Sequence, residues 1–143
     1  MLPGLSLHAL TLVTKTLGHT ARLRIVAMLG HNRLSVCQIA SVLEVPPSTA
    51  SGYLLELRRA GLVSEQREGK WVYYRLAADE TVELVVRLAL FLVSADAQIV
   101  KDERIARGLN GASPEAICAC AGEDAPIVRP PEADDRPGGR GSH

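Results

Sequence analysis

The order of helix, turn and strand signals in residues 18–77 constrains the fold of this chain more than any other feature. Ser35 and Gln38 match a capping box, in which each side chain bonds a backbone amide of the first helical turn, so we expect a short helix over residues 35–43. The Val45-Pro46-Pro47 step ends it, because proline cannot continue a helix. Pro47 suits the first position of a new helix, which we expect over residues 47–60. Two helices joined by a tight turn are typical of a helix-turn-helix.

A β-hairpin pattern follows these two helices. Residues 63–67 and 71–76 show an alternating pattern and are rich in residues that favour strands. Gly69 between them permits the positive φ that a tight hairpin needs. Before the helix-turn-helix, apolar residues at helical spacing predict one helix along residues 10–17 and another along residues 23–29. We therefore predict a mainly α winged helix-turn-helix, in which four helices precede the hairpin and a fifth, long helix follows it.

Composition limits the chain to one small domain. It has 143 residues, 47% of them apolar, with one Trp, three Tyr and one Phe, which suits a helical core of Leu, Val, Ile and Ala. The longest apolar run, residues 82–93, contains two charges and is shorter than the roughly 20 residues that span a bilayer. With no cleavable leader visible, we expect a cytoplasmic protein without a membrane partner. Three cysteines in such a chain favour reactive or metal-binding thiols over structural disulfides.

The zero net charge hides an asymmetry between the two halves of the chain. Residues 1–78 contain nine Lys and Arg against four Glu, a net charge of +5, and the remainder carries the balancing −5. A basic half is what a phosphate-facing surface requires, because neutralised phosphates release counterions. The charge therefore indicates DNA as a partner, with an ordinary solvated basic face as the alternative.

A helical pattern occupies residues 79–107 without interruption. Its apolar stripe is longer than a small domain covers alone, so we predict that this helix and the first one form a homodimer interface, with packing inside one chain as the alternative. The expected interface residues are Leu10, Val13, Leu17, Val85, Leu88, Leu92, Ala95 and Ile99. We divide the chain into a DNA-binding and dimerisation domain (residues 1–108), a Cys-containing sensor tail (109–121) and a Pro- and Gly-rich segment expected to be disordered (122–143).

Several motifs in residues 17–77 resemble those of the ArsR (ArsR/SmtB) family of small, dimeric, metal- or metalloid-responsive winged-helix repressors. These motifs are TARLRI at residues 20–25, SVC at 35–37, STAS at 48–51, LLELRRAGLV at 54–63 and WVYYRL at 71–76. The resemblance implies a repressor that occupies its operator when unliganded and leaves it when metal binds.

The recognition helix and the wing supply the expected DNA contacts. The first turns of a recognition helix face the major groove, and cations beside a wing turn follow the minor groove or its phosphates, unless they serve only solubility. The family often has Arg-His where this chain has Gly52-Tyr53, so we expect weaker or differently centred base readout. A dimer favours an inverted repeat with half-sites about 10 bp, or a multiple, apart. The expected contacts are Pro47, Ser48, Thr49, Ser51, Gly52, Tyr53, Arg67 and Lys70.

The expected sensor combines three cysteines. Cys37 falls at about the second position of its helix, where the dipole and unpaired amides favour the thiolate. The arsenic-sensing branch opens this helix with a C-x-C pair, whereas this chain has Ser35 at the first position. Cys118 and Cys120 bring the thiolates to three, the number that As(III) and Sb(III) prefer. The resemblance therefore implies a Cys37, Cys118 and Cys120 site with As(III) or Sb(III) as inducer and no organic cofactor.

Other readings of these cysteines stay open. Cys37 is alternatively a small core residue, and the tail pair is alternatively inert or redox-active. A repressor of the same fold that senses oxidants or persulfide through a disulfide between Cys37 and the tail needs no metal. An enzyme with Cys37 as nucleophile and His31 as base is a remote alternative, because the chain lacks a phosphate loop and paired acids. The site closes within one chain or across the dimer, and a long interface helix favours the second arrangement.

Overall fold

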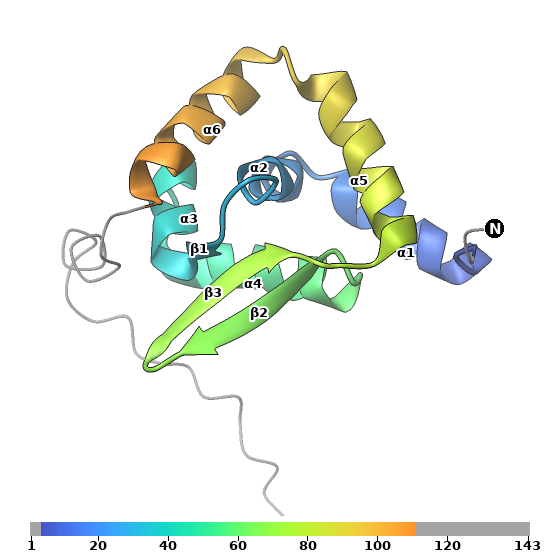
Figure 1. The fold of residues 1–143 in the computed structure, drawn as a ribbon, viewed down its shortest axis with the longest axis horizontal. Coiled ribbons are helices and arrows are strands. Elements are labelled where there is room, and N and C mark those ends of the chain that lie inside the picture. Colours follow the sequence, from blue (N-terminus) through green and yellow to red (C-terminus); the bar gives the residue numbers. More distant parts are fainter. Residues whose placement is uncertain (1–3, 111–143) are drawn as a thin grey trace, which may run out of the picture.

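The computed structural model describes residues 4–110, which form a mainly helical structure with a small antiparallel sheet (Figure 1). Nearly all of the expected sensor tail and the whole of residues 122–143 lie outside the described residues. The elements are α1 (Leu7–Leu17), α2 (Thr20–Met28), β1 (Leu34–Ser35), α3 (Val36–Leu43), α4 (Pro47–Arg59), β2 (Val63–Glu68), β3 (Trp71–Leu76), α5 (Glu80–Val93) and α6 (Ala97–Leu109).

Local signals set the bounds of α3 and α4, as the sequence predicts. The Ser35 Oγ accepts a hydrogen bond from the Gln38 amide at 3.3 Å, and the Gln38 Oε1 accepts one from the Ser35 amide at 2.9 Å. Glu44 ends α3 in the left-handed region with φ 56°, and Pro47 then begins α4. Gly61 follows α4 with φ 75°. The capping box and the position of the tight turn between the two helices are confirmed.

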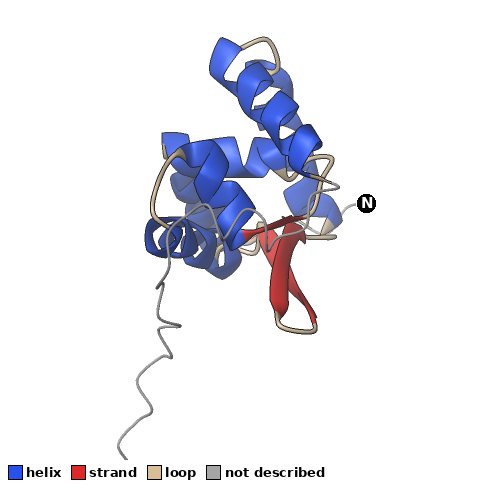
Figure 2. Cartoon of the chain, turned by 90° about the vertical axis from the view of Figure 1, so that its left-hand side faces the viewer, coloured by secondary structure: helices blue, strands red, loops and turns tan. Residues whose placement is uncertain are grey.

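The three strands form an antiparallel sheet in the order β1-β3-β2. Val63 of β2 pairs with Leu76 of β3, and Gly69 takes the positive φ of 58° at the turn that joins them. The hairpin extends away from the helices as a wing (Figure 2). The two-residue strand β1, where Leu34 pairs with Tyr74, was not foreseen, because a strand this short has no alternating pattern to detect.

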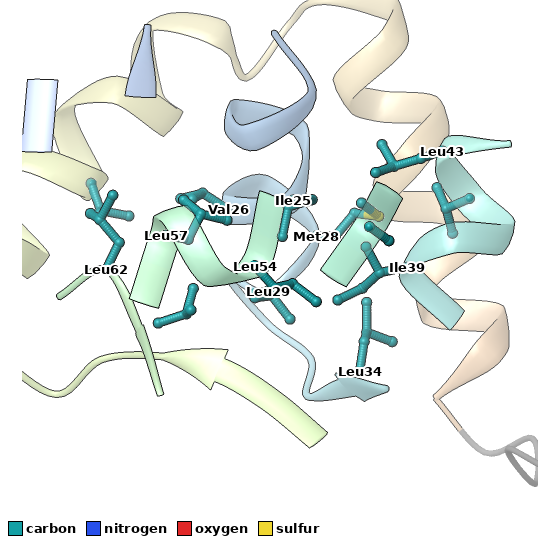
Figure 3. Packing of buried hydrophobic residues seen from close by; sticks show 14 of the residues in the cluster. Ile25, Val26, Met28, Leu29, Leu34, Ile39, Leu43, Leu54, Leu57 and Leu62 are labelled. Carbon is teal, nitrogen blue, oxygen red and sulfur yellow. The ribbon is translucent and has the colours of Figure 1, made fainter. Parts of the chain in front are cut away.

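The core lies around α2, which is enclosed by the other helices (Figure 1). Ile25, Val26 and Met28 of α2 are fully buried and face Leu54 and Leu57 of α4 (Figure 3). Leu34 of β1 and Ile39 of α3 close one end of this cluster, and Leu62, which follows α4, closes the other.

The prediction of one long helix over residues 79–107 is wrong. The helix stops at Val93 and restarts at Ala97, because the Asp96 carboxylate accepts hydrogen bonds from the amides of Gln98 and Ile99 at 2.9 and 3.3 Å and so caps a new helix. The second helix, α6, turns back and packs on α2 and α3 (Figure 1). Its end therefore returns to its own chain instead of continuing along the direction of α5.

Candidate functional site

The outer face of α4 presents most of the predicted DNA contacts. Ala50, Leu54 and Leu57 are fully buried and fix the helix on the core. No side chain caps its N-terminus, so the first turn presents the positive end of the helix dipole to an approaching phosphate. Of the predicted contacts on this helix, Ser48, Thr49, Ser51 and Gly52 are exposed and Pro47 and Tyr53 are half-buried.

His19 lies beside this face, although the sequence gives no reason to place it there. It is the N-cap residue of α2, where its Nδ1 accepts a hydrogen bond from the Ala21 amide at 3.2 Å. Its ring centroid lies 5.1 Å from that of Tyr53 at a tilted angle. The ring contact joins the start of α2 to the recognition helix and restricts the orientation of Tyr53.

The two predicted wing cations are exposed at the hairpin turn. Arg67 lies near the end of β2, and Lys70 follows Gly69 in the turn itself. The Lys70 Nζ lies 5.3 Å from the ring centroid of Trp71 on β3. A cation over an aromatic face keeps its charge at the surface, so this contact is compatible with a role toward phosphate.

Arg33, which the sequence analysis did not single out, precedes β1 at one edge of the sheet and pairs with Glu68 of β2 at the other edge. Its guanidinium donates two hydrogen bonds to the Glu68 carboxylate, at 2.6 and 3.0 Å, and lies 4.4 Å from the ring centroid of Tyr73. The hydrogen bonds raise the pKa of Arg33 and lower the pKa of Glu68. Because the Glu68 carboxylate neutralises this guanidinium, Arg33 adds less to the basic character of the wing than the sequence count implies.

A second ion pair connects the end of α4 to the wing. Arg58 lies 3.1 Å from the carboxylate of Glu65 on β2, and the Tyr74 hydroxyl donates to the same carboxylate at 3.4 Å. Burial, and then the charge of Glu65, raises the pKa of Tyr74. These contacts fix the position of the wing relative to α4.

Cys37 occupies the second residue of α3, where the sequence predicts it. Ser35 is the N-cap and Val36 the first helical residue, and the Cys37 side chain is half-buried. Its sulfur is disulfide-bonded in the structure. Cys118 and Cys120, the other two predicted ligands, lie outside the described residues. Packing of α3 against α4 places this sulfur one helix away from the predicted DNA contacts.

Polar ties fasten α6 to the helices beneath it. Arg24 of α2 donates two hydrogen bonds to the Asp102 carboxylate at 2.7 and 3.0 Å, and Gln98 donates a third at 2.9 Å. Asp102 is only 1% exposed, and its hydrogen bonds raise the pKa of Arg24 despite partial burial. At the C-terminal end of α6, the Gln38 Nε2 donates to the Leu109 carbonyl at 3.1 Å.

The predicted dimer surface divides into exposed and buried members. Leu10, Leu88 and Leu92 are 43%, 60% and 72% exposed, as a surface that awaits a partner requires. Leu17 and Val85 are half-buried, and Ala95 is exposed in the link between α5 and α6. Two assignments need correction, because Val13 and Ile99 are buried inside the chain and leave nothing for a partner to contact. Leu84 and Phe91 extend the exposed apolar face of α5 instead.

His31 lies apart from the cysteine chemistry, in a cleft of about 610 Å³ between α2, α5 and α6. Leu90 and Val86 line its apolar side, and Arg87, paired with Glu83 at 3.1 Å, lines its charged side. Cys37 does not line this cleft. The cleft therefore does not bring together the nucleophile and base that an enzyme would need.

Within residues 4–110, no three His, Cys, Asp or Glu side chains are grouped so as to hold a metal ion. Over the same range, no helix combines the length and apolar character needed to cross a bilayer.

Comparison with known proteins gives a consistent set of relatives. Residues 19–65 match the family described as "Bacterial regulatory protein, arsR family". The biofilm growth-associated repressor of Agrobacterium fabrum is 36% identical over 89 residues, which cover 61% of this chain and 76% of that one. The arsenic resistance transcriptional regulator ArsR1 of Pseudomonas putida is 30% identical over 111 residues, which cover 77% of this chain and 86% of that one.

A solved structure shares the fold. It is the homodimeric winged helix-turn-helix DNA-binding domain of a possible ArsR-family regulator from Mycobacterium bovis. It superimposes with a TM-score of 0.56 at 30% sequence identity, covering 67% of this chain and 94% of that one. The winged helix-turn-helix predicted from the sequence is thereby confirmed.

Proposed function

Because the chain belongs to the ArsR family of bacterial regulatory proteins, we propose that it is a homodimeric transcriptional repressor whose hold on operator DNA is controlled by the sulfur of Cys37. Like these relatives, which are named as a repressor and a transcriptional regulator, the chain is a DNA-binding regulator and not an enzyme. The homodimeric domain from M. bovis supports a dimer here. Since a repressor acts on the chromosome, we place the protein in the cytoplasm.

The proposed DNA surface is the exposed start of α4 together with the wing. Short hydroxyls of Ser48, Thr49 and Ser51 stand on the outer face of α4, where a recognition helix meets base edges and phosphates. Arg67 and Lys70 stand at the wing turn, and the Arg58–Glu65 pair fixes the wing relative to the helix. A dimer would present two such surfaces to an inverted repeat.

The proposed inducer is As(III) or Sb(III), bound by the thiolates of Cys37, Cys118 and Cys120. One observation supports this most strongly: the end of α6, which precedes the two tail cysteines in the sequence, is hydrogen-bonded to Gln38, the residue next to Cys37. Soft thiolates select soft ions, and a relative named for arsenic resistance supports the metalloid. The return of α6 favours closure within one chain, in contrast to the expectation from an unbroken helix.

The proposed switch acts through the contact between α3 and α4. Ligation draws Cys37 toward the tail and so tilts the first turn of α3, and the tight turn at Glu44 passes that movement to α4. A coupling free energy of only about 1–3 kcal/mol changes operator affinity about 5- to 150-fold. The movement required is therefore small.

X-ray absorption at the arsenic edge tests the ligand set directly. Purified, reduced protein loaded with one equivalent of arsenite should show three sulfur neighbours. The Cys37→Ser variant should show fewer, and so should Cys118→Ser and Cys120→Ser, while all three remain folded. Oxygen neighbours in the wild-type spectrum would reject the metalloid site.

A second candidate function is redox sensing, and the disulfide of Cys37 favours it. Two thiols would lose two protons and two electrons to an oxidant such as a peroxide, which becomes water or an alcohol, and form a disulfide between Cys37 and a tail cysteine. Peroxide would then release DNA without arsenite, and a dithiol reductant would restore binding. Release by arsenite under strictly reducing conditions separates the first candidate from this one.

A further inference from the structure

The position of His19 is fixed through both its backbone and its ring. Its Nδ1 accepts a hydrogen bond from the Ala21 amide at 3.2 Å, and its carbonyl accepts one from the Leu23 amide at 3.0 Å. A ring nitrogen that accepts a hydrogen bond carries no proton, so the imidazole is neutral in this arrangement. The ring centroid lies 5.1 Å from that of Tyr53 on α4, with 44° between the ring planes. His19 is therefore a fixed, uncharged ring beside the recognition helix.

The turn that carries His19 is also tied to α1. The Nε of Arg22, in the first turn of α2, donates a hydrogen bond to the carbonyl of Thr16 at 2.7 Å. Thr16 is buried near the end of α1. Through His19, the ring of Tyr53 is thus in contact with the turn between α1 and α2, in addition to the core beneath α4.

Tyr53 lies where a DNA groove would reach it. It is half-buried in the second turn of α4 and packs on the core, and its hydroxyl makes no hydrogen bond within residues 4–110. The preceding Gly52 adds no side chain, and the space that its Cβ would occupy is open. A glycine at an exposed position lets a ligand approach the backbone closely. The edge of a groove can therefore come within reach of the Tyr53 ring and hydroxyl.

We propose that His19 is a positioning residue for base readout: it holds the ring of Tyr53 in the orientation in which Tyr53 contacts a base edge. The inference rests on the proposed function, in that it takes the outer face of α4 as the DNA surface. A side chain that is already ordered loses less conformational entropy on binding, which changes affinity about twofold to tenfold for one such side chain. Because tyrosine and a neutral imidazole carry no charge, the effect falls on the preferred sequence and leaves the phosphate-based affinity for other sequences unchanged.

Two substitutions separate the ring of His19 from its role as the N-cap of α2. His19→Asn keeps an acceptor for the Ala21 amide, because asparagine is among the best N-cap residues, but it has no ring. His19→Phe keeps a ring beside Tyr53 but has no acceptor. If His19 served only to begin α2, the asparagine variant would read DNA like the wild type and the phenylalanine variant would be impaired. The positioning role requires the reverse.

The measurement is a ratio of two affinities of the full-length chain under reducing conditions. One affinity is for a duplex that the wild type selects from a random pool, and the other is for a random duplex, both by fluorescence anisotropy at one salt concentration. Urea unfolding of the same proteins gives the midpoint that reports the loss of the cap. Repeating His19→Asn in a Tyr53→Leu background shows whether the effect acts through Tyr53.

We expect His19→Asn to lower the ratio about twofold to tenfold, with the urea midpoint and the affinity for the random duplex unchanged. His19→Phe should lower the midpoint and keep the ratio. In the Tyr53→Leu background, His19→Asn should have no further effect on the ratio.

A ratio that follows the urea midpoint, so that His19→Phe loses discrimination and His19→Asn keeps it, overturns the positioning role. An equal loss from His19→Asn with and without Tyr53 overturns it too, because His19 then acts on DNA directly. A wild type that enriches no sequence from the pool overturns base readout by α4, and with it the proposed DNA surface.

Discussion

The recognition helix α4 and the C-terminal helix α6 are attached to the same core in different ways. α4 inserts three fully buried apolar side chains, Ala50, Leu54 and Leu57, among those of α2. α6 buries Ile99 and Ala106 but also relies on polar contacts, from Arg24 to Asp102 at its middle and from Gln38 to Leu109 at its C-terminal end. The proposed DNA-reading helix is thus part of the core, whereas α6 is also held by polar contacts that single substitutions can remove.

The largest expected effect comes from breaking the buried ion pair beneath α6. Asp102→Ala leaves Arg24 and Gln98 without their acceptor, and removing one partner of a buried pair costs about 3–5 kcal/mol. Since Arg24 is still 20% exposed and reaches water, we expect the lower end of this range. Urea unfolding measures the loss, and hydrogen exchange should show the amides of α6 opening while those of α4 stay protected.

Glu83→Ala is the control for that prediction. Glu83 pairs with Arg87 at 3.1 Å on an exposed face of α5, and surface pairs contribute no more than about 1 kcal/mol. If Asp102→Ala cost no more than Glu83→Ala, or exposed α4 and α6 equally, the contrast between the two helices would be wrong.

A smaller effect is expected at the apolar face of α5. Leu92 is 72% exposed in one chain, and a dimer that covers it should weaken by about 2 kcal/mol, or roughly 30-fold in Kd, when Leu92→Glu puts a charge there. Analytical ultracentrifugation measures the shift. Val100→Glu, on α6 and 39% exposed, is the matched control and should leave the dimer intact. Equal dissociation of both variants would move the interface away from α5.

The wing provides a still smaller effect, measured as a salt dependence. Arg67→Ala should lower affinity for all DNA sequences and flatten the slope of log K against log salt by up to about 0.9, the value of one phosphate contact. Glu68→Gln should steepen that slope, because it frees the guanidinium of Arg33. Fluorescence anisotropy with a random duplex measures both. An unchanged slope for Arg67→Ala would mean that Arg67 contacts no phosphate and serves only solubility.

The smallest effect is a pH dependence of the wing. Arg33 lowers the pKa of Glu68 below its ordinary value of 4.5, so the pair stabilises the wing fully above that pH and loses its contribution as the pH falls through the lower folded value. Fluorescence of Trp71, at the start of β3, should follow this transition in the wild type but not in Glu68→Gln. A transition that persists in the variant would point to another group.

The sequence predicts best where its signals act over a few residues. The capping box of Ser35 and Gln38, Pro47 at the start of α4 and Gly69 at the wing turn each fix a bound through local bonding, and each was found as expected. The break at residues 94–96 was missed, because apolar spacing continues across it. Asp96 was the available signal, since aspartate is a strong N-cap even inside an apolar pattern.

In the candidate site, too, the residues fixed by local contacts were predicted and those fixed by distant parts of the chain were not. Cys37 was placed correctly, because its position follows from the local cap of α3. Arg33 and His19 were missed, since the first contacts a strand and the second a helix far along the chain. Val13 and Ile99 were assigned to a dimer surface because periodicity shows which face of a helix is apolar, but not whether its own chain or a partner covers it.

The most direct test of the central claim, that the sulfur of Cys37 controls DNA attachment, is the affinity of the reduced protein for a duplex selected by it from a random pool, with and without arsenite. The account predicts a loss of affinity of about 5- to 150-fold on adding arsenite to the wild type, and no change for Cys37→Ser, whose affinity without arsenite should equal that of the wild type. Release of Cys37→Ser by arsenite, or undiminished binding of the loaded wild type, would contradict it.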